Sequence, residues 1–289
     1  MTRVLVFGAG GRVGNRLALS VPGEIAGKFL TRSECDITSA GAVQDAVEAW
    51  RPDVVINAAA YTAVDDAESD PSRAFAVNAE GPRNVAAAAA SVKARIIHIS
   101  TDYVFDGETR LPYTPEDQPN PLNVYGKSKR EGEIAVRDSN ARSLVIRASW
   151  LYDTEGRNFL RAVLERMMKG QPLRVVADQV GSPTSAAGLA RIVWVCATHP
   201  EIEGIHHWAG LGRASWHEFA VAIQELAISS GLVKSAVMIE PVTSAEYGTP
   251  ARRPRFSVLD SSALSKALGR SPDPWREALA DSLSQVTRA

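Results

Sequence analysis

Two residues four positions apart, Tyr125 and Lys129, form the pattern in this sequence that points most directly to chemistry. Residues at this spacing lie on one face of a helix, so the lysine ammonium would sit beside the tyrosine hydroxyl. We expect the cation to lower the pKa of Tyr125 from its ordinary value of about 10. A tyrosine tuned in this way acts as an acid or a base in ketone and alcohol redox chemistry. The alternative is an exposed helix on which the two side chains merely share a face.

A glycine-rich turn near the N-terminus supplies the second signal. The apolar run at 3–7 is typical of a buried parallel strand, and it leads directly into glycines with a G-x-x-G-x-x-G spacing. Such a turn clears side chains from the path of a pyrophosphate and presents the amides of a helix N-terminus to it. We therefore expect a dinucleotide site here rather than a plain strand-to-helix turn. Its residues are Gly8, Gly10, Gly11, Arg12, Val13 and Gly14.

Strand and helix patterns alternate in the first half of the chain, as a doubly wound parallel sheet requires. After about residue 150 the pattern loosens, and Gly and Pro mark the joints. We predict a Rossmann-type α/β fold, with a cofactor-binding domain at 1–150 and a smaller α+β substrate lobe at 151–289 whose segments can return to the first domain. The expected strands are 3–7, 28–31, 54–57, 95–100, 144–147, 173–176, 205–208 and 237–241. The expected helices are 12–20, 41–50, 66–91, 123–138, 157–169, 186–198, 215–230 and 275–286.

Two further segments follow predicted strands, at the edge where open α/β sheets bind ligands. Thr101 would donate a hydrogen bond to a substrate carbonyl and align it with Tyr125; a turn that satisfies its own backbone is the alternative. Small residues between Asn57 and Tyr61 would let a planar cofactor ring lie close to the backbone. The alternative there is tight packing between a strand and a helix.

The composition is that of an ordinary soluble globular protein, with 289 residues and a formal net charge of −1. Because there is no global basic field, we expect neither nucleic acid nor a membrane as a partner. Cys35 and Cys196 match no metal-ligand or disulfide spacing, which suits a reducing cytosol. The first strand begins too close to Met1 for a signal peptide, and no apolar run is long enough to span a bilayer. We thus expect a cytoplasmic protein without a bound metal.

Over nearly its whole length, the chain resembles the extended short-chain dehydrogenases/reductases, and more narrowly the dTDP-4-dehydrorhamnose reductase family. The segments that carry this resemblance are the glycine turn at 8–14, N-A-A-A-Y-T-A-V-D at 57–65, S-T-D-Y-V-F at 100–105, Y-G-K-S-K at 125–129, R-A-S-W-L-Y at 147–152, D-Q-V-G-S-P-T at 178–184 and A-R-R-P at 251–254. The last three are the more discriminating.

The resemblance implies a role for each matching residue. Thr101, Tyr125 and Lys129 would form the catalytic triad, and the last two would also touch the cofactor. Arg253 is expected at a diphosphate mainly on physical grounds, because a guanidinium fork suits phosphate oxygens. A surface salt bridge is the alternative for Arg253, as core packing is for Trp150. The dTDP-activated 4-keto-6-deoxysugar would contact Thr101, Asp102, Tyr103, Phe105, Trp150, Asn158, Gln179 and Arg253. The cofactor would further contact Arg32, Asp36, Ile37, Ala58, Ala59, Ala60, Tyr61 and Asn78.

The chain departs from the family pattern at two places. Members that bridge a dimer through Mg²⁺ carry an acidic side chain just after the glycine turn, where this chain has Asn15 and Arg16, so we expect no such bridge. NAD-selective sites carry Asp or Glu about 20 residues beyond the turn, whereas 30–33 reads Leu-Thr-Arg-Ser. Arg32 would pair with a 2′-phosphate, so NADPH is favoured, with NADH and a solvated Arg32 as the alternatives.

The expected reaction is therefore NADPH-dependent reduction of the C4 ketone of dTDP-4-dehydro-L-rhamnose to dTDP-L-rhamnose. Another dTDP-4-keto-6-deoxyhexose is an alternative substrate, because pocket shape decides between them. A dehydratase is less favoured, since it places an acidic residue where this chain has Tyr103. A non-catalytic regulatory subunit that binds the cofactor would not need an intact catalytic triad. The sequence leaves open whether the chain is a monomer or a homodimer.

Overall fold

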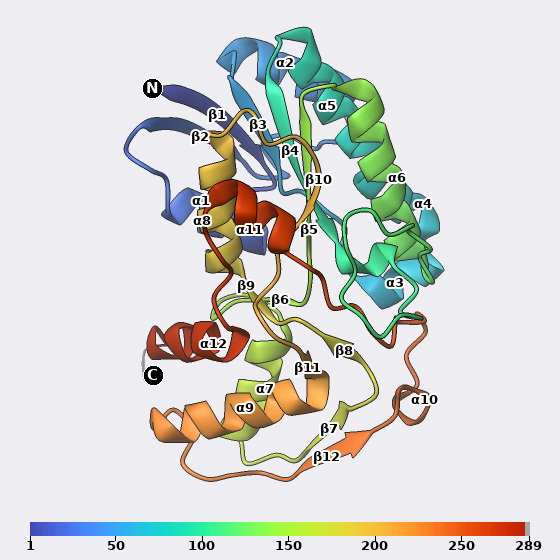
Figure 1. Ribbon diagram of the computed structural model, residues 1–289, viewed down its shortest axis with the longest axis vertical. Coiled ribbons are helices and arrows are strands. Elements are labelled where there is room, and N and C mark those ends of the chain that lie inside the picture. The colour runs from blue at the N-terminus through green and yellow to red at the C-terminus, as the bar shows by residue number, and fades with distance from the viewer. Residues whose placement is uncertain (287–289) are drawn as a thin grey trace.

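The computed structural model describes residues 1–286, and its largest element is a six-stranded parallel sheet (Figure 1). The spatial order β10-β5-β4-β3-β1-β2 places β1 between β2 and β3. The chain leaves β1 toward one side and comes back to its other side, so the switch point lies at the carboxyl ends of β1 and β3. The predicted doubly wound α/β fold is confirmed. The strands are β1 (Thr2–Phe7), β2 (Ile25–Leu30), β3 (Val54–Asn57), β4 (Arg95–Thr101), β5 (Ser143–Ala148) and β10 (Gly204–His207).

Helices cover both faces of this sheet, and each face has its own apolar core. Val43 of α2, Val85 of α5 and Val136 of α6 pack in one core. Leu17 of α1 and Leu189 of α8 pack in the other. Because the central strands are buried on both faces, their sequences are nearly continuous apolar runs. These helices are α1 (Arg12–Leu19), α2 (Ala40–Trp50), α5 (Gly81–Ser91), α6 (Val124–Ser139) and α8 (Ala186–Ala197).

A smaller lobe lies below the sheet in Figure 1 and has a third apolar core. Its helices α7 (Phe159–Met168), α9 (Trp216–Ser229) and α12 (Trp275–Ser284) pack beside a parallel pair of strands. That pair is β7 (Leu173–Val176) and β12 (Ile239–Val242). The short elements that sequence patterns did not predict are η2 (Asp102–Val104), β6 (Leu151–Tyr152), β8 (Val180–Gly181), β9 (Thr184–Ser185), β11 (Ala214–Ser215), α10 (Ser244–Tyr247) and α11 (Ser262–Leu268).

The prediction of one continuous helix at 66–91 is wrong. The segment forms α3 (Val64–Ser69), α4 (Pro71–Phe75) and the π-helical turn η1 (Ala76–Glu80) before α5 begins. Pro71 cannot continue a helix from the preceding turn, and the Asp70 carboxylate caps the new helix by accepting from the amide of Arg73 at 3.1 Å. The π-helical turn then carries its residues against α6, which lies beside the candidate site.

Two elements from the second half of the chain belong to the main sheet body. Strand β10 pairs in parallel with β5 at the sheet edge, and α8 packs against α1, where Trp194 Nε1 donates to the carbonyl of Leu17 at 3.2 Å. We therefore propose that the division near residue 150 separates roles: residues 1–150 with this returning segment would hold the cofactor, and the remaining segments would hold the substrate.

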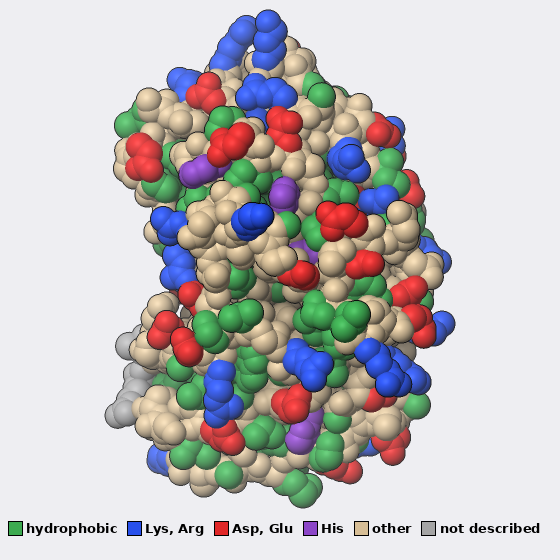
Figure 2. All heavy atoms as spheres, viewed as in Figure 1, with side chains coloured by type: hydrophobic (Ala, Val, Ile, Leu, Met, Phe, Trp, Pro, Cys, Tyr) green, Lys and Arg blue, Asp and Glu red, His purple; other side chains and the backbone are tan. Residues whose placement is uncertain are grey.

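On the face shown in Figure 2, Lys and Arg side chains alternate with Asp and Glu side chains. This distribution agrees with the net charge of −1. Within residues 1–286, every helix is too short or too polar to cross a bilayer.

Candidate active site

The glycine turn joins β1 to α1 at the switch point of the sheet. Gly8 has a φ of 83°, and a Cβ there would lie 2.4 Å from the amide nitrogen of Ala59. A Cβ on Gly14 would lie 2.1 Å from the carbonyl oxygen of Gly8. Backbone packing therefore requires both glycines. By contrast, a Cβ on Gly10 would make only an ordinary van der Waals contact with the Thr31 side chain, at 3.8 Å, so the fold alone does not require glycine there.

The N-terminus of α1 is open to an anion. Gly11 precedes the helix and supplies no side-chain cap, and there is no acidic residue in the first turn. The first bond that closes the helix runs from the amide of Asn15 to the carbonyl of Gly11 at 2.8 Å. The amide of Gly11 donates to the carbonyl of Gly8 at 3.0 Å, whereas those of Arg12, Val13 and Gly14 have no backbone partner among residues 1–286. Free amides at a helix start bind phosphate groups. The turn therefore has the shape and polarity of a pyrophosphate cradle.

The segment after β3 forms the other wall of this space. The amide of Ala58 donates to the carbonyl of Phe7 at 3.0 Å, which holds the segment against β1. Asn78 exchanges hydrogen bonds with the backbone of Tyr61, at 2.8 and 3.0 Å, and donates to Ser128 Oγ at 3.0 Å. The polar atoms of Asn78 are thus all used inside the protein. We correct the expected cofactor contact of its side chain to a role in positioning Tyr61.

Thr101, Tyr125 and Lys129 come together from two elements, the end of β4 and the first turns of α6. The Thr101 side chain is close enough to Tyr125 to lower the pKa of its hydroxyl, and the Tyr125 ring packs edge-on against Tyr103 with centroids 5.7 Å apart. Lys129 is 2% exposed and donates to the carbonyl of Ile99 at 2.7 Å. The three predicted catalytic side chains therefore share one buried corner at the carboxyl edge of the sheet.

The predicted lowering of the Tyr125 pKa is wrong for this structure. Burial raises the pKa of Tyr125 to about 12, and the negative charge of Asp102 adds to this rise. The interaction with Thr101 and the positive charge of Arg12 lower the pKa, but by less. Burial lowers the pKa of Lys129 to about 8, and the Glu133 charge opposes this. At neutral pH Tyr125 is therefore protonated, which is the form that donates a proton in a reduction.

Asp102 is 2% exposed and accepts from Thr101 Oγ1 at 3.1 Å. Its second oxygen, Oδ2, is buried and has no hydrogen-bond partner among residues 1–286. Burial raises the pKa of this carboxyl to about 7, while hydrogen bonds with Ser257 and Thr101 lower it. Asp102 thus controls the orientation of the Thr101 hydroxyl, beside the predicted substrate.

The end of β2 carries both a cation and a carboxylate. The Arg32 side chain is 67% exposed and pairs with Asp36 at 3.1 Å, so it remains close to solvent. Glu34, which the sequence prediction passed over, folds back so that its carboxylate accepts from the amide and the hydroxyl of Thr31 at 2.8 and 2.7 Å. The strand end therefore offers a partner for a 2′-phosphate and another for a ribose hydroxyl.

Trp150 lies at the entrance to the substrate lobe in a strained backbone conformation, with a φ of 46°. Its ring stacks on Trp216 with centroids 3.5 Å apart and an interplanar angle of 2°. A Cβ on Gly181 would lie 2.4 Å from the other side of the same ring. These contacts agree with core packing, which was the alternative for Trp150. The strained backbone of Trp150 is held in place by the surrounding structure.

Arg253 forms a bidentate ion pair with Asp65, at 3.0 and 2.7 Å, and its side chain is only 17% exposed. The pair is therefore a half-buried anchor at the edge of the site and not the exposed surface pair that was the alternative. Gln179 is 5% exposed and donates to Ser244 Oγ at 2.9 Å.

Three further predicted site residues have side chains that make contacts inside the fold. Phe105 is fully buried and stacks on Tyr113 with centroids 4.0 Å apart. Ile37 is 4% exposed in the core, and its carbonyl accepts from Asn84 at 3.0 Å. Asn158 caps α7 and donates to three carbonyls of the loop at 153–156. These side chains support the walls of the site in this structure, and their expected ligand contacts stay predictions.

Comparison with known proteins identifies the family. The family model described as the RmlD substrate binding domain matches residues 1–288. The chain belongs to this family. A dTDP-4-dehydrorhamnose reductase from Aggregatibacter actinomycetemcomitans is 38% identical over 96% of this chain and 97% of that protein. The spore coat polysaccharide biosynthesis protein SpsK from Bacillus subtilis is 40% identical over 100% of this chain and 99% of that protein.

A solved structure agrees with the family assignment. The dTDP-4-dehydrorhamnose reductase from Bacillus anthracis, in complex with NADP, has a TM-score of 0.91 and 34% identity and covers 99% of both chains. The predicted family, and the predicted class of oxidoreductase of the dTDP-4-dehydrorhamnose reductase type, are confirmed.

In this member of the RmlD family, several residues around the site escaped the sequence prediction. His98 and Glu133 lie within the predicted strand and helix, and both are fully buried. Asp65 and Trp216 are the partners of Arg253 and Trp150. The sequence offered a signal only for Glu133, which continues the helix face of Lys129 by one more step of four residues.

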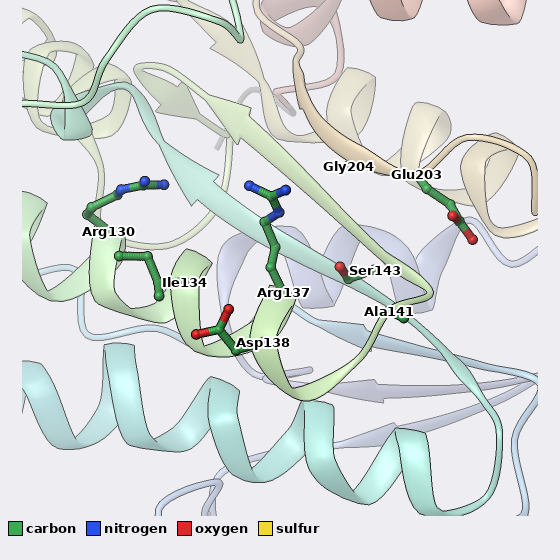
Figure 3. Close-up of a pocket in the computed structure, with 8 residues that line it drawn as sticks. All are labelled: Arg130, Ile134, Arg137, Asp138, Ala141, Ser143, Glu203 and Gly204. Atoms are coloured by element: carbon green, nitrogen blue, oxygen red, sulfur yellow. The ribbon is translucent and has the colours of Figure 1, made fainter.

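A hollow of about 350 Å³ lies between α6 and the amino ends of β5 and β10 (Figure 3). Arg130 and Arg137 extend over it from α6, and Glu203 and Gly204 border it from the start of β10. No predicted site residue lines it. Arg130 connects the hollow to the buried Glu133, with which it pairs at 2.9 Å.

Proposed function

We propose that this chain uses NADPH to reduce the C4 ketone of dTDP-4-dehydro-L-rhamnose to dTDP-L-rhamnose in the cytoplasm. The observation that carries the proposal is the burial of Thr101, Tyr125 and Lys129 together beside an open glycine turn. Whole-length relatives that are named dTDP-4-dehydrorhamnose reductases support the substrate. The relative in complex with NADP supports the cofactor, and two buried free cysteines agree with a reducing compartment.

The residues present fit a dinucleotide. The glycine turn and the uncapped start of α1 would receive the pyrophosphate, and the Arg32 guanidinium would receive a 2′-phosphate. The Glu34 carboxylate at the same strand end would accept a hydrogen bond from a ribose hydroxyl, so NADH stays the alternative cofactor. The remaining contacts that we propose are with Gly8, Gly11, Arg12, Val13, Gly14, Asp36, Ala58, Ala59, Ala60, Tyr61, Tyr125 and Lys129.

Bound NADPH supplies hydride to the carbonyl carbon. Tyr125 gives its hydroxyl proton to the oxygen that becomes the C4 hydroxyl. The Thr101 hydroxyl, which donates to Asp102 at 3.1 Å in this structure, would turn its proton from that carboxylate to the same oxygen when substrate is bound. The Lys129 ammonium stabilises the tyrosinate that remains. All three groups lie in a corner from which water is largely excluded, where fixed charges and dipoles act more strongly than in solution.

The substrate lobe would hold the dTDP-sugar between Trp150, Gln179 and Arg253. Arg253 contributes a cation whose position Asp65 already fixes. A diphosphate would share this guanidinium with the carboxylate, so the contact orients the nucleotide more than it adds net charge attraction. Asp102 and Tyr103 would border the sugar beside Thr101.

The decisive experiment follows NADPH oxidation with enzymatically prepared dTDP-4-dehydro-L-rhamnose and with other dTDP-4-keto-6-deoxyhexoses, and identifies the products by NMR. Oxidation with the first compound and formation of dTDP-L-rhamnose is the expected result. Turnover only with other sugars would favour the second candidate, a reductase of another dTDP-4-keto-6-deoxyhexose. Cofactor binding without turnover of any sugar would indicate a regulatory subunit.

Replacing Arg32 with Ser is expected to raise the KM for NADPH about tenfold and to leave the KM for NADH nearly unchanged, because a charged hydrogen bond to phosphate contributes about 1.5 kcal/mol or more. Steady-state kinetics with both cofactors measure the difference. Arg83→Ser is the control, since Arg83 is another exposed arginine in an ion pair. Equal losses with both cofactors would contradict a role in recognition of the 2′-phosphate.

A further inference from the structure

Lys129 has an unusual environment for an ammonium group. Among residues 1–286, its Nζ donates to a single oxygen atom, the carbonyl oxygen of Ile99, at 2.7 Å. The nearest carboxylate on its own helix is Glu133, whose oxygens bond to Ser100, Arg130 and Arg147 instead. On the remaining side, Nζ lies 3.5 Å from Nε2 of the buried His98. The protonation of His98 therefore decides whether Nζ faces an acceptor or a donor.

Asn57 fixes the tautomer of His98. The Asn57 Oδ1 accepts from the amide of Ala59 at 3.1 Å, so its Nδ2 is the atom that faces His98 Nδ1, at 3.2 Å. An amide NH₂ only donates, so Nδ1 must accept, and the proton of the neutral imidazole then lies on Nε2. Burial and the neighbouring Lys129 both lower the pKa of His98 well below its ordinary value, so the ring stays neutral.

The Nε2–H of His98 thus points at Nζ of Lys129. When Lys129 is an ammonium, the Nε2–H group of His98 and Nζ are both donors, and the positive end of the N–H dipole points toward a cation. When Lys129 is a neutral amine, its nitrogen has a lone pair that accepts a hydrogen bond from the same N–H group. We propose that His98 is a positioning residue for the reaction: held as the Nε2–H tautomer by Asn57, it favours the neutral amine of Lys129 and so sets the pH at which Lys129 changes charge.

The charged groups near this pair act in opposite directions. Lys129 and Glu133 come from α6, and the Glu133 charge favours the ammonium. Asn57 of β3 is uncharged, and Arg147 of β5 is neutralised by Glu133. The inference rests on the proposed function only for the catalytic role of Lys129. The expected consequence is that reductase activity declines as the pH rises through about 8, where burial places the pKa of Lys129.

The tautomer can be tested without any turnover. In protein labelled with ¹⁵N-histidine, long-range ¹⁵N–¹H spectra distinguish the Nδ1–H, Nε2–H and doubly protonated rings, and the His98→Phe variant identifies the His98 signals by their loss. We expect an Nε2–H ring that does not titrate between about pH 6 and pH 9. An Nδ1–H ring, or an imidazolium, would overturn the proposal even if the protein proved to be an active reductase.

Asn57→Asp is a second variant, with which the proposal can be tested if the His98→Phe variant does not fold. A carboxylate at this position accepts, so His98 must move its proton to Nδ1 and turn a lone pair toward Lys129. We expect the Nδ1–H tautomer in the spectra. In both variants, the titration of the Lys129 side chain, followed by ¹³C NMR of its Cε, should shift upward by about one pH unit. The alkaline limb of kcat/KM should move by the same amount.

The two readouts separate the inference from the proposed function. A Lys129 titration that shifts in both variants supports the role of His98 whether or not the sugar is reduced. A Lys129 titration unchanged by His98→Phe would show that burial alone controls the amine, and that outcome would refute the role of His98 while leaving the reductase activity intact.

Discussion

A Tyr125→Phe variant is expected to lose about a thousandfold in kcat, because general acid catalysis by a positioned side chain typically contributes factors of about 10²–10⁴. The ring keeps its edge-on contact with Tyr103, so the change removes little except the hydroxyl. The raised pKa of Tyr125 makes it a proton donor throughout the neutral range. Single-turnover measurement of NADPH oxidation reports the chemical step directly.

Tyr103→Phe is the matched control for this loss. Tyr103 lies in the same corner, with its ring edge-on to Tyr125, but it has no place in the proton transfer. We expect its kcat to stay within about tenfold of the wild-type value, which corresponds to about 1.4 kcal/mol, since the ring remains in place and the lost hydroxyl transfers no proton. Undiminished turnover in Tyr125→Phe, or an equal loss in Tyr103→Phe, would remove Tyr125 from the role of acid.

The parts of the site that sequence predicts well are those defined by local spacing. The relation of Tyr125 to Lys129 is set by one turn of a helix, and the need for Gly8 and Gly14 is set by one tight turn. A run such as the S-T-D-Y-V-F motif shows the limit of this reasoning. Thr101 faces the site and Phe105 faces a core, and only the packing of the 3₁₀ turn between them decides which residue does which.

Long-range pairing accounts for most of what the sequence did not reveal. Strand β10 joins β5 across more than fifty intervening residues, and no local pattern records such a partner. The edge strand β2 begins at Ile25, earlier than its expected start at residue 28, because pairing with β1 extends a segment with weak apolar character. Buried polar groups such as His98 are equally hidden, since their partners come from other elements.

Replacing Glu133 with Gln is expected to lower the free energy of unfolding by about 3–5 kcal/mol, the usual cost of breaking a buried ion pair by removing one partner. Glu133 is fully buried and binds Arg147 through two bonds of 2.8 Å. It also accepts from Ser100 Oγ at 2.6 Å, next to Thr101. The variant would leave the Arg147 guanidinium buried without a countercharge. Urea denaturation measures the loss.

The pH dependence of stability gives a second readout. Burial raises the pKa of Glu133, but the hydrogen bonds and charge of Arg147, with help from Ser100 and Arg130, outweigh burial and hold it below its ordinary range. A carboxyl with a depressed pKa stabilises the fold above its unfolded value, about 4.3, and this contribution is lost as the pH falls through the folded pKa. We expect the free energy of unfolding of the wild-type protein to fall in acid through the protonation of Glu133. In the Glu133→Gln variant this part of the fall should be absent.

Glu165→Gln is the control for these measurements, because Glu165 forms an exposed ion pair with Arg161 in another helix. An exposed pair contributes at most about 1 kcal/mol, so its removal should change little. If the Glu133→Gln variant behaved like this control, α6 would be held by apolar packing alone. The double variant Glu133→Gln/Arg147→Met tests the cause of the loss. Because it removes the orphaned cation, it should recover part of the stability that Glu133→Gln loses.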